Sequence, residues 1–209
     1  TFNDALNVLQ NSLTYLYSNP SGDRFWYDTR PTLRKTVEDR ATQQKSEDVD
    51  FEIERRLKTI RKERPFGRLH ICPNNSSEVS DDQDIGLVIL KCKDAYKANT
   101  PNDLAIQAAE NILNTRGSTP RIYRNMLVFV APDQNTINVL RQEVRRYLAW
   151  LSIRDDKDIL NLDAAQNRET ENNLNRSNTQ IEAQIREGSY SFKHKKYGRH
   201  IAASLSLFF

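Results

Sequence analysis

The clearest hydrophobic pattern in the chain is a short apolar run followed by a long periodic segment. Residues 126–131 are continuously apolar between turn residues, which predicts a strand buried on both faces. Pro132 ends this run, and Asp133 is placed to cap a helix whose free N–H groups favour a carboxylate. Together these segments predict a strand–turn–helix unit, as found in α/β layers. The apolar face of the helix consists of Ile137, Leu140, Val144, Tyr147, Leu148 and Leu151.

Two strands and a helix are predicted upstream of this unit. Residues 68–72 and 85–91 are short apolar runs bounded by polar segments. Thr100 and Pro101 suit the start of a helix, which would end near Gly117. Because this helix joins two strands, the strands 85–91 and 126–131 are expected to run parallel. The buried face expected for the helix is Leu104, Ala105, Ala108, Ala109, Ile112 and Leu113.

The first third of the chain predicts helices around a β-hairpin. A helix begins near Asp4, and the aromatic runs 13–17 and 24–28 flank a turn rich in Ser, Asn, Pro and Gly. A helix followed by a hairpin is the outline of a winged-helix domain. Two amphipathic helices are expected to follow, with apolar positions at Leu33, Val37, Ala41, Val49, Ile53, Leu57 and Ile60.

After residue 155 the chain becomes rich in Asn, Gln, Glu and Arg, which predicts one long, mostly exposed helix. The tail that follows would be a final strand, a docking peptide or an artefact. The predicted fold class is α/β (α+β) and helix-rich, with a small, mostly parallel three-stranded sheet flanked by helices. An N-terminal helix–β-hairpin (winged-helix-like) element and a long C-terminal helix complete it. The expected regions are 1–66 (helix, hairpin and helices), 67–154 (small α/β domain) and 155–209 (long polar helix and tail).

Composition and charge narrow the class of protein only broadly. Of 209 residues, 37% are hydrophobic and 28% are charged, which favours a helix-rich protein with long exposed faces. The net charge of +3 argues neither for nor against nucleic acid as a partner. No apolar stretch approaches the roughly 18 residues that span a bilayer, and no secretory signal is visible. We therefore expect a cytoplasmic protein with no membrane partner and, since it begins at Thr1, a fragment of a longer chain.

No catalytic constellation is recognisable. The sequence contains no G-x-x-x-x-G-K-[ST] phosphate loop, no G-x-G-x-x-G, no H-E-x-x-H and no G-x-S-x-G, so no catalytic, cofactor or metal residue is expected. Cys72 and Cys92 lack C-x-x-C spacing and are expected to lie reduced in neighbouring strands, with a metal site or a disulfide as the alternative. His70 is expected to be packed in a strand rather than to act as a base. A nuclease would need an acidic metal-ligand arrangement that the sequence does not show.

Three groups of residues are candidates for contact with nucleic acid or a partner. The hairpin aromatics could stack bases or enter a groove, or could anchor the hairpin to nearby helices. The basic run 55–64 could contact phosphates, or could form a solvated face balanced by glutamates. Arginines before the strand 126–131 could bind a phosphate or a neighbouring subunit's nucleotide, or could pair with local acids. The candidates are Phe25, Trp26, Tyr27, Arg30, Arg55, Arg56, Arg61, Lys62, Arg121 and Arg124.

Several phrases of the sequence resemble a known family. They are LTYLY (13–17), RFWYDTRP (24–31), EDRA (38–41), RIYRNMLVFVAPD (121–133) and RRYLAWLSI (145–153). In this order they resemble domain-of-unknown-function family 499. Its members are large bacterial and archaeal ATPases with an AAA+-type core, often encoded in anti-phage loci such as BREX. The resemblance covers roughly Leu6 to Arg186. It implies a phosphate loop upstream, so that ATP and Mg²⁺ would bind in the parent protein and not in this chain.

Two functions are expected as alternatives. The first is a non-catalytic regulatory or interaction region of such an ATPase, engaged in defence against phage. Its partner would be the rest of the parent ATPase or another subunit. The second is a nucleic-acid-binding module that contacts DNA through the aromatic hairpin and the Arg55–Arg64 helix.

Overall fold

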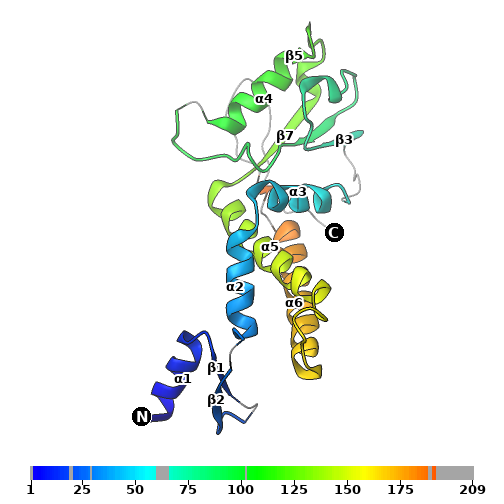
Figure 1. Cartoon of the computed structure of the whole chain (residues 1–209). Coiled ribbons are helices and arrows are strands. Elements are labelled where there is room, and N and C mark those ends of the chain that lie inside the picture. Colours follow the sequence, from blue (N-terminus) through cyan, green and yellow to red (C-terminus); the bar gives the residue numbers. More distant parts are fainter. Residues whose placement is uncertain are drawn as a thin grey trace. The chain divides into compact units, whose positions relative to one another are not determined.

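The structure, a computed structural model, describes residues 2–18, 21–28, 30–59, 66–101, 103–187 and 190–191. The chain divides into two compact units (Figure 1). Unit 1 comprises residues 1–44 and 145–175, and unit 2 comprises residues 45–144 and 176–209. This division differs from the expected regions 1–66, 67–154 and 155–209. The reason is that two long helices, α5 (Gln134–Asp155) and α6 (Ala164–Glu187), each contribute to both units.

The core of unit 2 is a four-stranded sheet in the order β3–β4–β7–β8. The strands β3 (Arg68–Ile71), β4 (Gly86–Ile89) and β7 (Leu127–Pro132) run parallel, as predicted. The short strand β8 (Tyr190–Ser191) pairs antiparallel with the end of β7. The structure thus confirms the α/β class with a three-stranded parallel sheet, an N-terminal helix and hairpin, and a long C-terminal helix.

The strand that is buried along its whole length is β4, not β7. All four residues of β4 are buried, whereas in β7 only Val130 and Pro132 are buried and the others are half-buried. β4 has a neighbouring strand on both sides. Beyond β7 lies only β8, which pairs with Ala131 and Pro132 and leaves the rest of that edge uncovered by the described strands. The apolar run 126–131 therefore predicted a strand correctly but overstated its burial.

Helix α4 (Leu104–Asn114) packs on the sheet through Ala105 and Ile112, which share a core cluster with Val88 and Leu90. Its N-terminal cap is Asp103, whose Oδ1 accepts the N–H of Ile106, and not Thr100 as expected.

Two further expectations about α4 are wrong. Leu104 is exposed, because a helix beginning at Asp103 turns this position outward. Gly117 does not cap the helix. It has a φ of +63° in the turn between β5 (Thr115–Arg116) and β6 (Thr119–Pro120), a conformation that favours glycine.

The remaining helices of unit 2 bury the predicted apolar positions. In α3 (Ser46–Leu57), Val49, Ile53 and Leu57 are fully buried. Asp133 caps α5 by accepting the N–H groups of Asn135 and Thr136, as expected from the sequence. The buried positions of α5 and α6 within unit 2 are Ile137, Leu140, Glu143, Val144, Ser177, Ile181 and Ile185.

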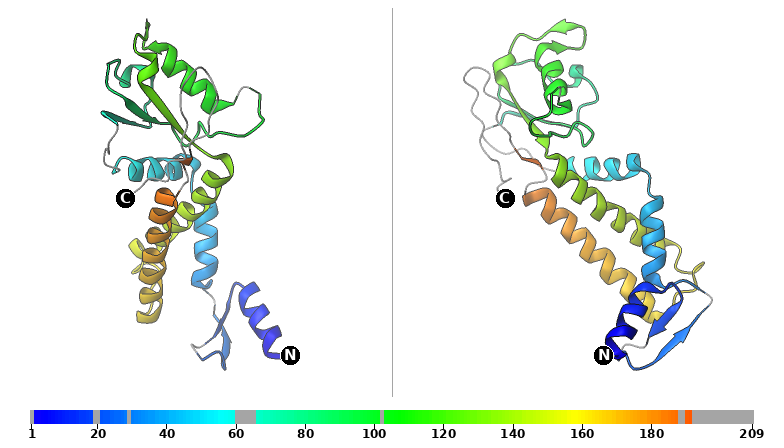
Figure 2. Two further views of the ribbon diagram at one scale, coloured as in Figure 1. Left: turned by 180° about the vertical axis from the view of Figure 1, so that it is seen from behind. Right: turned by 90° about the vertical axis from the view of Figure 1, so that its left-hand side faces the viewer.

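Unit 1 contains α1 (Phe2–Ser12), an antiparallel hairpin of β1 (Leu16–Ser18) and β2 (Phe25–Tyr27), and α2 (Leu33–Gln43). α1 and the hairpin are adjacent in the views of Figures 1 and 2. The second half of α5 and the first half of α6 complete the unit. Its core cluster is Leu33, Val37, Ala149, Trp150, Ile153 and Leu174.

Polar contacts also hold unit 1 together. Thr32 caps α2 by accepting the N–H of Lys35. The guanidinium of Arg40 on α2 contacts Asp156 at 2.7 Å and also Ser152, both near the end of α5. The hairpin therefore leads directly into a helix that is fixed against α5.

Candidate contact site at the aromatic hairpin

The aromatic residues of the hairpin form a stacked pair. Tyr17 on β1 faces Trp26 on β2 in the strand register, and their ring centroids lie 5.9 Å apart with the planes 16° from parallel. The hydroxyl of Tyr17 donates to the carbonyls of Arg30 and Pro31, at 3.2 and 3.0 Å. These bonds tie the pair to the segment that enters α2. Trp26 nevertheless remains 45% exposed, so a large part of its surface can contact another molecule.

A groove of about 320 Å³ lies beside this pair. Its walls come from the hairpin, from the beginning of α2, from the segment 159–163 between α5 and α6, and from the first turn of α6. The apolar lining includes Trp26, Leu33, Ile159 and Leu162. Ile159 is almost fully exposed for an isoleucine, at 79%, although it borders the groove. This volume lies at the lower end of the range found for pockets that bind small molecules.

Three charged side chains line the groove: Asp28, Arg30 and Asp163. Asp28 Oδ1 accepts the backbone N–H of Arg30 at 3.3 Å. Asp163 Oδ1 accepts the N–H of Gln166 at 2.8 Å, and Gln166 Oε1 accepts the N–H of Asp163, which is a reciprocal cap at the start of α6. The Arg30 guanidinium makes no hydrogen bond or ion pair with the described residues. The groove thus combines an aromatic wall with two carboxylates and one guanidinium.

The candidates Arg55 and Arg56 lie on α3 in unit 2 and share one carboxylate, that of Glu52. Glu52 accepts the Nε–H of Arg55 and the Nε–H of Arg56, both at 2.7 Å. Burial would raise the pKa of Glu52, but the hydrogen bonds from the two arginines outweigh it and hold that pKa below its usual value. The Arg56 side chain is only 9% exposed, so its ion pair with Glu52 lies in the interior of unit 2. Arg61 and Lys62 lie outside the described residues.

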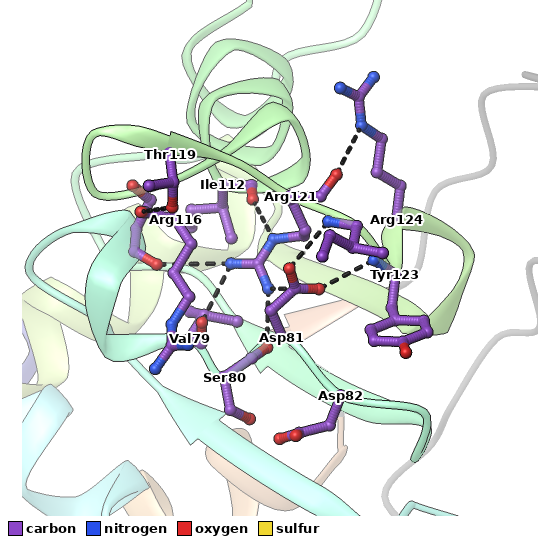
Figure 3. A network of polar contacts seen from close by, with 12 residues as sticks. Val79, Ser80, Asp81, Asp82, Ile112, Arg116, Thr119, Arg121, Tyr123 and Arg124 are labelled. Atoms are coloured by element: carbon purple, nitrogen blue, oxygen red, sulfur yellow. Dashed lines mark hydrogen bonds and ion pairs between the residues drawn. The ribbon is translucent and has the colours of Figure 1, made fainter.

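Arg121 is buried in a network of backbone oxygens (Figure 3). Its Nε donates to the carbonyl of Ile112 at 2.8 Å, Nη1 to that of Ser80 at 2.7 Å, and Nη2 to that of Val79 at 3.0 Å. The Asp81 carboxylate lies 3.8 Å from Nη1 and accepts the N–H groups of Ile122 and Tyr123.

This network assigns a structural role to Arg121. Burial lowers its pKa, and the charge of Asp81 opposes that shift. The guanidinium joins the end of α4, the loop 76–81 and the segment leading to β7, and it is enclosed rather than directed at an external phosphate. Arg124 is exposed and donates to the carbonyl of Arg121 at 3.3 Å, so its guanidinium lies at the border of the network (Figure 3).

His70 lies on β3, as expected, with Nε2 at 3.3 Å from the hydroxyl of Ser80. Burial lowers the pKa of His70, and the charges of Arg68 and Arg121 lower it further. The unfolded chain therefore binds a proton at this residue more readily than the folded chain, and stability falls as the pH falls below the ordinary value of 6.5.

We expect the free energy of unfolding of unit 2 to decrease as the pH falls from 6.5 to the lower folded-state pKa of His70. In His70→Gln this decrease should be smaller. Urea unfolding at a series of pH values measures the effect. If the free energy of unfolding depends on pH in His70→Gln as it does in the wild type, the proton is bound at another residue.

No cluster of metal-ligand side chains is present in the described part of the chain. That part contains no group of three or more His, Cys, Asp or Glu side chains suited to a metal ion. Cys72 and Cys92 follow β3 and β4 as buried free thiols, and burial raises the pKa of Cys72. None of the described helices is both long enough and apolar enough to cross a bilayer.

No protein-family model, curated protein or solved structure matches the chain. The site must therefore be interpreted from its own geometry. That geometry brings Trp26 and Arg30 together at one groove and places Phe25 and Tyr27 on the same strand. It assigns Arg55, Arg56, Arg121 and Arg124 to unit 2. Asp28, Ile159 and Asp163 were not among the predicted contact residues. Of these, only Asp163 has a signal in the sequence, because the D-x-x-Q spacing of residues 163–166 indicates a helix cap.

Proposed function

We propose that this chain is a non-catalytic interaction region that docks a partner through unit 1. The observation that carries the proposal is that six large apolar and aromatic side chains are exposed on α1, the hairpin and the link between them. Exposed apolar groups that gather in one region mark interaction sites more often than scattered ones. We call this region the hairpin surface; it consists of Val8, Leu9, Leu13, Tyr15, Trp26 and Tyr27.

The contacts of the other candidates support this choice. Arg56 and Arg121 are enclosed in unit 2, where they bind Glu52 and backbone carbonyls. An enclosed guanidinium that already binds protein oxygens has little capacity left for a phosphate. The hairpin surface, in contrast, offers large rigid side chains of the kind that dominate binding energy at interfaces.

The resemblance to domain-of-unknown-function family 499 supplies the context of the proposal. In that context the chain is part of an AAA+-type ATPase that acts in bacterial defence against phage. ATP and Mg²⁺ bind upstream, and the hairpin surface docks on the rest of the ATPase or on another subunit. A phosphate loop in the upstream part of the same gene would support this kinship.

A second candidate function is nucleic-acid binding by the hairpin. The observation that favours it is the stacked Tyr17–Trp26 pair, because such a pair can extend a stack of bases. Retention on DNA that weakens with rising salt, and that Trp26→Ala removes, would favour this function. A chain that passes through a DNA column at low salt would count against it.

The hairpin surface can be tested by placing a charge on it. Tyr27→Asp in the full-length protein is expected to change the rate of ATP hydrolysis about tenfold, since the loss of one interface anchor costs roughly 1–2 kcal/mol of docking energy. The matched control is Val139→Asp, which charges an exposed apolar residue on α5. Equal rates in the two variants would overturn the docking role of the hairpin surface.

A further inference from the structure

We propose that the groove beside Trp26 receives an arginine or lysine side chain of the partner that docks on the hairpin surface. This inference rests on the proposed docking function and adds the chemistry of the partner. It is carried by three features of the groove: its aromatic wall, the sign of its charge and its apolar lining.

The aromatic wall suits a cation. Trp26 is held in place by stacking on Tyr17, whose hydroxyl is fixed by two backbone carbonyls. The face of an indole attracts a guanidinium or ammonium group more strongly than other aromatic rings do. A ring that is already oriented loses little conformational entropy when it binds. The groove volume of about 320 Å³ admits a side chain rather than a folded element.

The charges of the lining favour a cation over a phosphate. Asp28 and Asp163 contribute two negative charges and Arg30 one positive charge, so the lining carries a net charge of −1. The field of Asp28 also outweighs that of Arg30 at the neighbouring phenol. After burial, the carboxylate of Asp28 is the larger charge effect on the pKa of Tyr17 and raises it, whereas Arg30 lowers it less. A phosphate in the same place would face both carboxylates.

The apolar lining accommodates the stem of such a side chain. Leu33, Ile159 and Leu162 line the groove together with the aromatic pair. Arginine and lysine bury their methylene groups on apolar surface while the charged end reaches polar groups. The exposed Ile159 would be covered by this stem, which gives a reason for its position.

Binding can be followed through the intrinsic fluorescence of the full chain. The sequence contains two tryptophans, and Trp150 is buried in the core of unit 1, so a ligand in the groove changes mainly the emission of Trp26. The probes are a short peptide of alternating arginine and proline, a glutamate–proline peptide of equal length, and an oligothymidylate. We expect the arginine–proline peptide to change the emission in a saturable, salt-sensitive way and the glutamate–proline peptide to leave it unchanged.

Three variants distinguish the possible ligands, with circular dichroism to confirm that each is folded. Since Trp26→Ala removes the reporter, its binding is measured by calorimetry, and we expect about a tenfold loss of affinity for the arginine–proline peptide. Asp28→Asn keeps an acceptor for the Arg30 N–H and is expected to weaken binding about threefold, the size of one partly exposed charge contact. Arg30→Gln removes the like charge and is expected to strengthen binding about threefold.

Weaker binding of the arginine–proline peptide by Arg30→Gln would overturn the proposal. If the oligothymidylate binds and Arg30→Gln abolishes its binding, the groove is a nucleic-acid site. If neither peptide changes the emission of Trp26, the groove does not receive a cationic side chain. Tyr27 does not line the groove, so a rate change in Tyr27→Asp without binding of the arginine–proline peptide would refute the groove proposal alone and leave the docking function intact.

Discussion

Replacing Arg121 with methionine is expected to lower the free energy of unfolding of unit 2 by about 3–5 kcal/mol, the usual cost of removing one partner of a buried charged network. Methionine is of similar length but donates no hydrogen bond. The carbonyls of Ile112, Val79 and Ser80 would lose their charged donor, and Asp81 would lose its counter-charge. Since the loop 76–81 is held by these bonds, the effect would reach both α4 and the segment before β7.

Urea unfolding monitored by circular dichroism measures this loss. The matched control is Arg124→Met, because Arg124 is exposed and gives one long hydrogen bond at the border of the same network. We expect the control to change stability by less than about 0.5 kcal/mol, as is usual for surface positions. Similar losses in both variants would mean that Arg121 is not the centre of the network.

The second large effect is expected at Glu52. Changing Glu52 to alanine leaves Arg56, which is 9% exposed, without its partner at 2.7 Å, and is expected to cost about 3 kcal/mol. Glu182 lies 3.9 Å from the other side of Arg56 and compensates only in part, since its own side chain is half exposed. Arg55→Ala is the control, because Arg55 is exposed and its pair with Glu52 is worth less than about 1 kcal/mol.

A paired replacement tests the cause of this loss. In Glu52→Leu combined with Arg56→Met, no charge is left buried and the apolar side chains can pack in the same volume. We expect the double variant to recover most of the stability lost in Glu52→Ala, as measured by the same urea unfolding. A double variant as unstable as the single one would show that packing of the glutamate, rather than its charge, is what matters.

Local patterns predicted the elements of the fold well. The strand at residues 126–131, the cap at Asp133 and the helix face that begins at Ile137 depend on residues that are close in the sequence. The structure confirms the strand, the cap and the first half of the helix face, whereas its second half, Tyr147, Leu148 and Leu151, is only half-buried. The hairpin was predictable for the same reason. The cap of α4 was misplaced by three residues because Thr100 and Asp103 both suit a helix start, and the sequence does not rank two such caps.

The roles of the arginines were not predictable in this way. Arg121 binds residues about 40 positions earlier in the chain, such as Ser80, 41 residues away. A buried arginine and an exposed one have the same appearance in a sequence, and only the fold shows which carbonyls surround it. The groove could not be predicted for the same reason, because Trp26 and Asp163 come from distant segments that meet in unit 1.

The central claim is that the hairpin surface, and not the arginines of unit 2, is where this chain meets its partner. Hydrogen–deuterium exchange of the full-length protein tests it most directly, by comparing the wild type with Tyr27→Asp, in which docking is expected to be weakened. We predict faster exchange in the variant for peptides covering α1 and the hairpin, and unchanged exchange around Arg121. Unchanged exchange at the hairpin together with faster exchange between α4 and β7 would contradict the account.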